Sequence, residues 1–222
     1  MPIQGIQQPD LLPVSVSLRL RKYDGVHDFA LDWYQDRETL LLVDGKDVPY
    51  TPERLTKMYH YLNDHGELYF IELLRNHSWA PVGDVTFWQD DMPIVIGDHS
   101  LRGKGIGRQV VTALIQRARA LGYTELSVDT IYDYNTGSRK MFEACGFRPC
   151  EATANGHRYR LVLSPEKKNR RPDSLSVLPR ANINRKISGF TLHPAESGFL
   201  QSLHNYHPYS EWSWKPCRHI EA

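Results

Sequence analysis

Apolar and polar side chains alternate along residues 14–21, a pattern typical of a strand with one buried face. Asp24 follows as a suitable N-cap, and the apolar residues that come after it at helical spacing predict a first helix. We interpret the polar stretch after this helix as a loop. Thr51 and Pro52 then predict the start of a second helix, with the proline at its first position, and Gly66 predicts its end.

The middle of the chain predicts three successive strands. They cover residues 67–74, 81–88 and 92–97, with turns at residues 76–78 and 89–91. The third strand is almost wholly apolar, so we expect both of its faces to be buried. The two aspartates of the second turn are explained by the turn itself, because aspartate is a common turn residue.

The clearest helix in the sequence covers residues 107–121, where the apolar residues form a single stripe and Gly122 follows as a stop. The remaining elements are a strand, a helix and a closing pair of strands, expected over residues 125–132, 136–145, 148–156 and 157–164. The resulting order is a strand, two helices, three strands, a helix, a strand, a helix and two strands.

The character of the sequence changes after residue 164. Residues 165–172 are charged and bounded by prolines, which is typical of a linker. The remaining residues show no hydrophobic periodicity and predict a poorly ordered tail; the alternative is a tail that docks on its own domain or on a partner through Trp212 and Trp214. We therefore expect one domain over residues 14–164 and an appendage over residues 165–222.

Composition narrows the class of protein. A chain of 222 residues with 41% hydrophobic side chains can form one domain with a core, and a net charge of +1 argues against a protein that coats nucleic acid or an anionic membrane. No apolar run reaches the roughly 20 residues needed to cross a bilayer, and the start does not resemble a signal peptide. The three cysteines fit reduced thiols and do not predict a metal site. We expect a cytoplasmic protein, either a monomer or a homodimer.

A glycine-rich segment between the third central strand and the clearest helix is the main candidate for chemistry. Its three glycines let the backbone approach a ligand closely, and the first amides of the helix lack internal acceptors at the positive end of the helix dipole. Such a site suits a pyrophosphate, and two basic side chains add positive charge. The segment comprises Arg102, Gly103, Lys104, Gly105, Ile106, Gly107 and Arg108.

Two familiar phosphate-binding motifs do not fit this segment. A Walker loop requires serine or threonine after its lysine, but Gly105 follows Lys104. The dinucleotide fingerprint requires a third glycine one residue later than Gly107, and it follows the first strand of its domain. Arg102-x-x-Gly105-x-Gly107 instead resembles the first signature of the GNAT superfamily of N-acetyltransferases, and residues 135–147 resemble its second signature.

The resemblance covers residues 14–164 and implies a mixed fold of the α+β class, with a mostly antiparallel sheet of six to seven strands and flanking helices. The fourth and fifth strands of this fold splay apart, and acetyl-coenzyme A enters between them as the acyl donor, with no metal. By position, the resemblance implies that the backbone amides from Arg102 to Arg108 hold the pyrophosphate and that the backbones of Val95 and Ile96 bond the pantetheine. It also implies that Asn135 reaches the pantetheine arm and that Ser138 lies near the sulfur.

The implied reaction is direct attack of a neutral amine on the thioester, which requires a proton acceptor. The candidates are Asp84, Asp129 and Glu72, and Asp129 is favoured because it lies on the strand beside the cleft. Many members of the superfamily have a tyrosine as general acid where this chain has Phe142. Proton donation to the leaving thiolate therefore falls to Tyr132, Tyr134, Ser138 or water, or the thiolate leaves without a general acid.

The sequence resembles a branch that includes aminoglycoside 6'-N-acetyltransferases, spermidine acetyltransferases and ribosomal-protein alanine N-acetyltransferases. This branch implies a cationic amine as acceptor, and aromatic side chains at positions 33, 34, 88 and 132 suit one through cation–π contacts. We expect a small cationic amine, and no nucleic-acid or membrane partner. Two alternatives are an acetyltransferase of protein N-termini or lysines and a non-catalytic acyl-coenzyme A-binding module.

Overall fold

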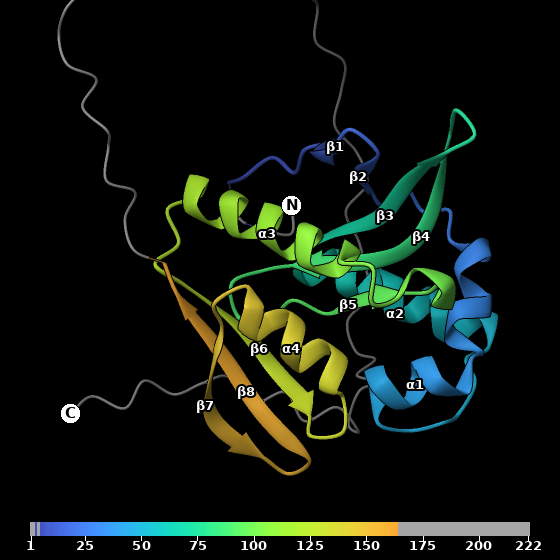
Figure 1. Cartoon of the computed structure of the whole chain (residues 1–222). Helices are drawn as coiled ribbons and strands as arrows, with labels where there is room; N and C mark the ends of the chain where they lie inside the picture. Colours follow the sequence, from blue (N-terminus) through green and yellow to red (C-terminus); the bar gives the residue numbers. More distant parts are fainter. Residues whose placement is uncertain (1–2, 4, 164–222) are drawn as a thin grey trace, which may run out of the picture. The chain divides into compact units, whose positions relative to one another are not determined.

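The computed structural model describes residue 3 and residues 5–163. These residues form eight strands in two antiparallel sheets, with helices packed against them (Figure 1). The expected tail over residues 165–222 lies outside the described residues.

The larger sheet has five strands in the order β1-β2-β3-β4-β5, and every neighbouring pair is antiparallel. Its strands are β1 (Leu11–Ser15), β2 (Leu18–Lys22), β3 (Glu67–Arg75), β4 (Ser78–Phe87) and β5 (Ile94–Ile96). The smaller sheet has three strands in the order β6-β8-β7, also antiparallel. They are β6 (Glu125–Tyr132), β7 (Arg148–Thr153) and β8 (Gly156–Val162).

The helices divide between the two faces of the larger sheet. One core packs α3 (Ile106–Ala120) and α4 (Thr136–Ala144) against both sheets. The other core packs the 3₁₀ helix η1 (Asp28–Tyr34) and the helices α1 (Arg37–Asp44) and α2 (Pro52–His65) against the opposite face. A short 3₁₀ helix, η2 (His99–Leu101), connects β5 to α3. Since β3 contributes alternate residues to the two cores, most of its side chains are buried.

Several predicted elements are confirmed because their signals are local. The Thr51 hydroxyl accepts a hydrogen bond from the Arg54 amide at 3.2 Å, and Pro52 is the first residue of α2. The apolar stripe of α3 is buried against the sheets. The helix at residues 136–145 and the strands expected after β2 are also present, with ends shifted by a few residues and β5 shorter than expected.

Three expectations are wrong. The strand at residues 14–21 is a hairpin, in which β1 and β2 meet at a turn where Val16 is 95% exposed. Asp24 does not cap a helix: its carboxylate accepts from the Val26 amide at 3.1 Å, and a 3₁₀ helix begins only at Asp28. The polar loop before Thr51 contains α1, which the sequence analysis missed.

The expected sheet of six to seven strands is also corrected. The described residues form eight strands, divided into sheets of five and three that share no hydrogen-bonded strand pair. The initial hairpin adds one strand, so β5 and β6 correspond to the fourth and fifth strands of the expected fold. The α+β class itself is confirmed. None of the described helices combines the length and apolar character needed to cross a membrane.

Candidate active site

The two sheets separate between β5 and β6 (Figure 1). Near the start of β6 they are still joined: the Ser127 amide donates to the Gln89 carbonyl at 2.9 Å, and the Asp129 amide donates to Asp91 Oδ1 at 2.9 Å. No hydrogen bond links the remainder of β6 to β5 in the described part of the chain. The sheets therefore splay apart beyond Asp91 and Asp129, as expected from the resemblance.

Backbone direction decides which groups of β5 face this splay. Pro93 and Gly97 both bond to β4 through their backbones, at 3.0 and 2.9 Å. Because successive residues of a strand direct their backbone groups to opposite edges, Val95 also faces β4, whereas Ile94 and Ile96 face β6. Of the two strand residues expected to bond the pantetheine, Ile96 faces the splay. Ile94, which the sequence analysis did not select, faces it as well.

The glycine-rich loop supplies a set of free backbone donors. The Arg102 amide donates to the His99 carbonyl at 3.1 Å, and the Lys104 amide donates to the Leu101 carbonyl at 3.4 Å. Gly105 is the N-cap of α3 and provides no side-chain cap. Among the described residues, no acceptor takes the amides of Gly103, Gly105, Ile106, Gly107 and Arg108. Five N–H groups at the positive end of a long helix therefore remain open to an anion.

The glycines of the loop differ in why they are needed. Gly103 and Gly105 have φ angles of +70° and +80°, which other residues rarely adopt, and a Cβ on either would meet nothing within 4 Å. Their requirement is therefore conformational. At Gly107 a Cβ would lie 3.7 Å from the Met141 sulfur, an ordinary contact, so this position is not reserved for glycine by space.

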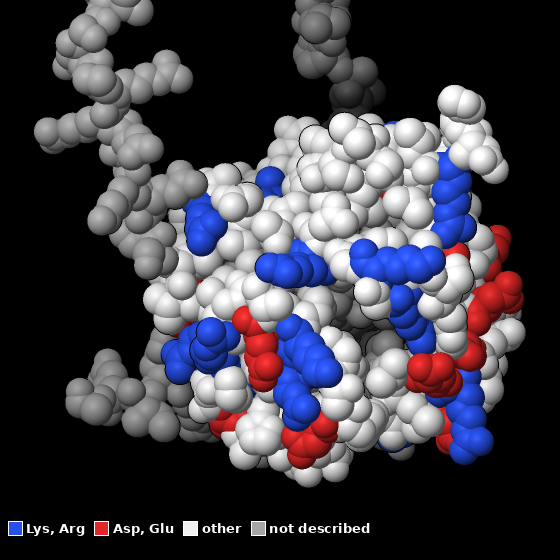
Figure 2. Space-filling model, viewed as in Figure 1, with Lys and Arg blue, Asp and Glu red and all other residues white. Residues whose placement is uncertain are grey.

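Figure 2 shows a hollow between α4 and α1, below the start of α3, with Lys and Arg side chains on its rim. Lys104 and Arg108, which were expected to add positive charge, are both exposed. The open amides and these charges lie on adjacent residues. The mouth of the splay therefore favours a negatively charged ligand.

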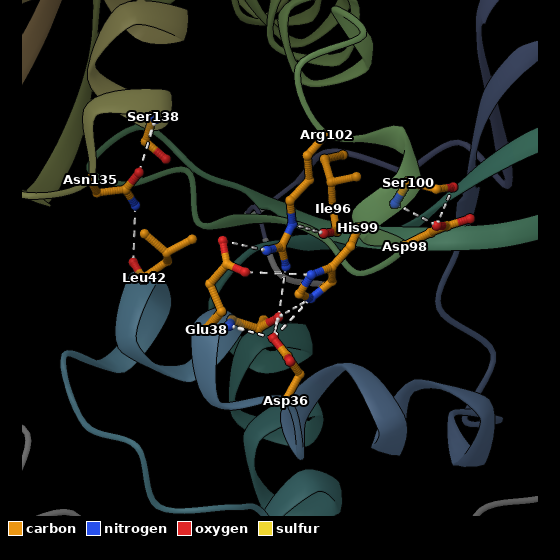
Figure 3. Close-up of polar contacts among 11 residues, drawn as sticks. Asp36, Glu38, Leu42, Ile96, Asp98, His99, Ser100, Arg102, Asn135 and Ser138 are labelled. Carbon is orange, nitrogen blue, oxygen red and sulfur yellow. Dashed lines mark hydrogen bonds and ion pairs between the residues drawn. The ribbon is translucent and has the colours of Figure 1, made fainter.

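The Arg102 side chain points to α1 rather than to the open amides (Figure 3). Its Nε donates to the Ile96 carbonyl at 3.0 Å, and its Nη2 donates to the Thr39 hydroxyl at 2.7 Å. Its Nη1 is buried without a hydrogen bond in the described part of the chain and lies 3.6 Å from a carboxylate oxygen of Glu38.

Asn135 caps α4 and also contacts α1 (Figure 3). Its Oδ1 accepts from the Ser138 amide at 3.0 Å, and its Nδ2 donates to the Leu42 carbonyl at 3.1 Å. Ser138 is half-buried in the first turn of α4. The two residues expected to lie along the acyl arm are thus adjacent at the start of α4, across the hollow from α1.

Asp84 is buried on the face of the sheet that η1 and α2 cover. Its carboxylate accepts hydrogen bonds from the hydroxyls of Tyr34 at 2.9 Å and Tyr59 at 2.8 Å. Burial raises the pKa of Asp84 to about 7, although the two tyrosine hydrogen bonds favour the charged form. Asp84 is paired with Val95 in the β4–β5 register, so the two side chains lie on the same face.

Asp129 and Asp91 lie together where the splay begins, but in different environments. Asp129 is half-exposed and paired with Arg158, whose Nε lies 3.1 Å from the carboxylate. Asp91 is buried; this raises its pKa to about 7, against the hydrogen bonds of the Asp129 and Met92 amides. The turn interpretation gave Asp91 no further role. Its contact with Asp129 spans 38 residues of sequence, so no local pattern announces it.

Glu72 and the candidate proton donors lie in distinct environments. Glu72 pairs with Arg19 and Arg21 on β2, both at 2.7 Å, on the side of β3 away from β5. Tyr132 is half-buried and stacks on Tyr134 with 5.3 Å between ring centroids. Burial raises the pKa of Tyr132, which favours the protonated hydroxyl.

The remaining aromatic candidates lie in different places: one in the core, one beside the splay and one at the other end of the sheet. Phe142 is buried and packs edge-on against Phe147, with 5.2 Å between ring centroids, so it belongs to the core. The Trp33 ring covers Gly97, where a Cβ would clash with the indole, and therefore lies over the end of β5. Trp88 packs in the same way against Gly66, at the other end of the sheet. Of the two tryptophans, Trp33 is the one beside the splay.

These residues fit the acyl donor that the resemblance implies. A diphosphate requires several unsatisfied donors close together, and the start of α3 provides them. An extended arm requires a strand edge with free backbone groups; β5 presents the Ile94 backbone and the Ile96 amide toward β6, whereas the Ile96 carbonyl accepts from Arg102. No group of three or more His, Cys, Asp or Glu side chains placed to hold a metal occurs among the described residues.

Comparisons with known proteins agree with the geometry. The family described as acetyltransferase (GNAT) matches residues 28–147, so the chain belongs to this family. The protein is therefore an acyl-coenzyme A-dependent N-acetyltransferase, as the two sequence signatures predicted. No curated protein matches the chain.

Solved structures share the fold at low identity. They include AAC(6')-Ib with ribostamycin and coenzyme A, at 16% identity and a TM-score of 0.57 over 70% of this chain and 99% of that one. RimL, a ribosomal alpha-N-protein acetyltransferase, in complex with coenzyme A has 20% identity and a TM-score of 0.55, over 69% of this chain and 98% of that one. Spermidine N-acetyltransferase from Vibrio cholerae with coenzyme A and spermine has 18% identity and a TM-score of 0.53, over 68% of this chain and 98% of that one. At these identities the likeness establishes the fold alone.

Proposed function

We propose that the protein transfers an acetyl group from acetyl-coenzyme A to the primary amine of a small cationic acceptor. The observation that carries this proposal is the row of five open amides at the start of α3, beside the separation of β5 from β6. The acceptor class is supported by solved structures of the same fold that hold ribostamycin or spermine.

On the donor side, the thioester supplies the acyl group and the chain supplies its orientation. The five open amides between Gly103 and Arg108 hold the diphosphate, and the Lys104 side chain adds charge. Ile94 and Ile96 direct their backbones toward the pantetheine arm, and an amide of β5 stabilises negative charge as it develops on the carbonyl oxygen. Fixing two reactants in one site can contribute on the order of 7–11 kcal/mol to lowering the barrier.

On the acceptor side, an ammonium ion cannot attack, so a proton must leave first. We assign the removal of this proton to the Asp84 carboxylate, with the hydroxyl of Tyr34, which hydrogen-bonds to it, connecting the amine to Asp84. A proton acceptor works best when its pKa lies near the working pH, and burial places that of Asp84 at about 7. Asp129, the candidate favoured by sequence, is already paired with Arg158.

A cationic acceptor suits the groups around the α1 side of the splay. Trp33 lies over the end of β5, and the stacked rings of Tyr132 and Tyr134 lie at the end of β6. The Asp129 carboxylate lies farther down the same strand. An acceptor with several amines keeps a positive charge on those that do not react. Aromatic faces and carboxylates both attract that charge.

The test is to incubate the full chain with acetyl-coenzyme A and a panel of polyamines, aminoglycosides and N-terminal peptides, and to follow release of the coenzyme A thiol. We expect the small amines to give the highest kcat/KM. Faster turnover of peptides, lost when residues 165–222 are deleted, would instead establish a protein acetyltransferase. Tight binding of acetyl-coenzyme A with no thiol release from any amine would establish a binding module.

A further inference from the structure

The helix α1 contacts both sides of the hollow. At its start, the Asp36 carboxylate caps the helix by accepting from the Thr39 amide at 2.7 Å. The same carboxylate lies 2.9 Å from His99 Nε2, so the start of α1 is bound to the segment that follows β5 (Figure 3). A carboxylate oxygen of Glu38 lies 3.6 Å from His99 Nδ1.

At its other end, α1 is bound to the segment between β6 and α4. The Tyr134 hydroxyl donates to the Leu41 carbonyl at 2.6 Å, and the Asn135 amide group donates to the Leu42 carbonyl at 3.1 Å. The helix stops at Gly45, whose φ is +68° and where a Cβ would lie 3.0 Å from the Tyr132 ring. The helix therefore spans the mouth of the splay from one side to the other.

Arg102 makes the central contact of this arrangement. Its guanidinium joins the last carbonyl of β5 to the hydroxyl of Thr39, which is itself 1% exposed and donates to Asp36 at 2.7 Å. The hydroxyl thus accepts one hydrogen bond and donates another. A planar fork of donors suits such a bridge, and a lysine cannot reproduce it.

We propose that Arg102 is a positioning residue that holds α1 through Thr39 as one wall of the acceptor site, and that its side chain does not bind the phosphates of the donor. This proposal rests on the proposed function. The position of α1 also affects Asp84, because Tyr34 lies just before the helix and donates to that carboxylate. Displacing α1 therefore disturbs both the orientation of the amine and its proton acceptor.

The test compares donor affinity with acceptor kinetics in variants of the full chain. For Arg102→Gln we expect the Kd of coenzyme A, measured by calorimetry, to stay within about threefold of wild type, while kcat/KM for the amine falls at least about tenfold. Thr39→Val keeps the shape of the side chain but removes the acceptor, so it should reproduce this effect. Thr39→Ser restores the hydroxyl and should restore the rate. The double variant should lose no more kcat/KM than Arg102→Gln alone, because both substitutions break the same hydrogen bond between Arg102 and Thr39.

Lys104→Gln is the opposite control, since it should weaken coenzyme A and leave the KM of the amine unchanged. The proposal is overturned if Arg102→Gln weakens coenzyme A more than about tenfold with the acceptor KM unchanged, or if Thr39→Val behaves as wild type. Should Arg102→Gln fail to fold, the Thr39 pair decides alone. If the wild-type chain acetylates no amine, the proposed function fails, whereas the coenzyme A affinities still show whether Arg102 contacts phosphate.

Discussion

The Asp91 carboxylate accepts a hydrogen bond from the Asp129 backbone amide at 2.9 Å, at the point where the two sheets separate. In a continuous sheet this amide would bond to the backbone of a neighbouring strand. Here a side chain takes that place, and β5 and β6 share no backbone pairing beyond it. The contact allows the sheets to separate without leaving this partly buried donor unpaired.

Asp91→Ala should therefore destabilise the domain. The substitution leaves the partly buried Asp129 amide without its acceptor. A fully buried unpaired donor costs about 1–3 kcal/mol, so we expect a loss near the lower end of that range. Urea unfolding measures the loss, and hydrogen exchange of the Asp129 amide should become faster. Asp91→Asn is the matched control, because its carbonyl oxygen can still accept the bond. Equal stability of the alanine variant and wild type would show that this contact does not stabilise the separation.

Gly105→Val should abolish binding of coenzyme A without unfolding the domain. A β-branched residue is strained at a φ of +80°, so the loop must change shape and the open amides lose their common direction. Gly122→Val is the matched control, because Gly122 also has a positive φ of +79° and open space around its Cβ, but follows the other end of α3. We expect similar losses of Tm in both variants and loss of calorimetric binding only in the first. Unchanged affinity in Gly105→Val would remove the loop from the binding site.

The parts of the fold that were predicted from sequence have signals contained within one element. The cap of α2 and the stripe of α3 are examples. The hairpin of β1 and β2 was missed because a turn of two residues preserves the alternation of side chains across it. The sequence does contain end signals for α1, because Asp36 precedes an apolar run and Gly45 follows it. The charged first turn of this helix, however, is also typical of a loop.

The same distinction holds for the site. The phosphate loop is contiguous, so its residues and spacing were visible in the sequence. Asp84 meets Tyr34 and Tyr59 across 50 and 25 residues, and only the packing of η1 and α2 on the sheet brings them together. Arg158 reaches Asp129 from the neighbouring strand, and no local pattern in the sequence marks the two as partners. Partners of a carboxylate depend on the tertiary fold, so sequence alone could not rank the candidates.

Asp84→Asn should change how stability depends on pH. The folded pKa of Asp84 is about 7, far above the usual 3.8, so between those values the folded chain holds a proton that the unfolded chain releases. The contribution of Asp84 to the free energy of unfolding is fully present below about pH 4 and is lost as the pH rises through about 7. Relative to wild type, the variant should therefore gain at least about 1 kcal/mol of unfolding free energy across that interval.

Asp98→Asn provides a control of opposite sign for this measurement. Hydrogen bonds from Ser100, together with Arg75, lower the pKa of Asp98, so its contribution is present above its usual pKa and is lost as the pH falls. This variant should lose stability relative to wild type as the pH rises. Parallel curves for Asp84→Asn and wild type in urea unfolding would show that Asp84 is not a buried acid with a raised pKa.

Tyr132→Phe tests whether the reaction needs a general acid. The raised pKa keeps the Tyr132 hydroxyl protonated at neutral pH, so it can donate to the departing sulfur. A thiolate with a pKa near 8.5 is nevertheless a good leaving group, and we expect kcat to fall by less than about tenfold. Single-turnover measurements isolate this step from product release. A loss of about 10²-fold or more, the usual range for general acid–base catalysis, would contradict this and make Tyr132 the essential proton donor in a chain that has phenylalanine at position 142.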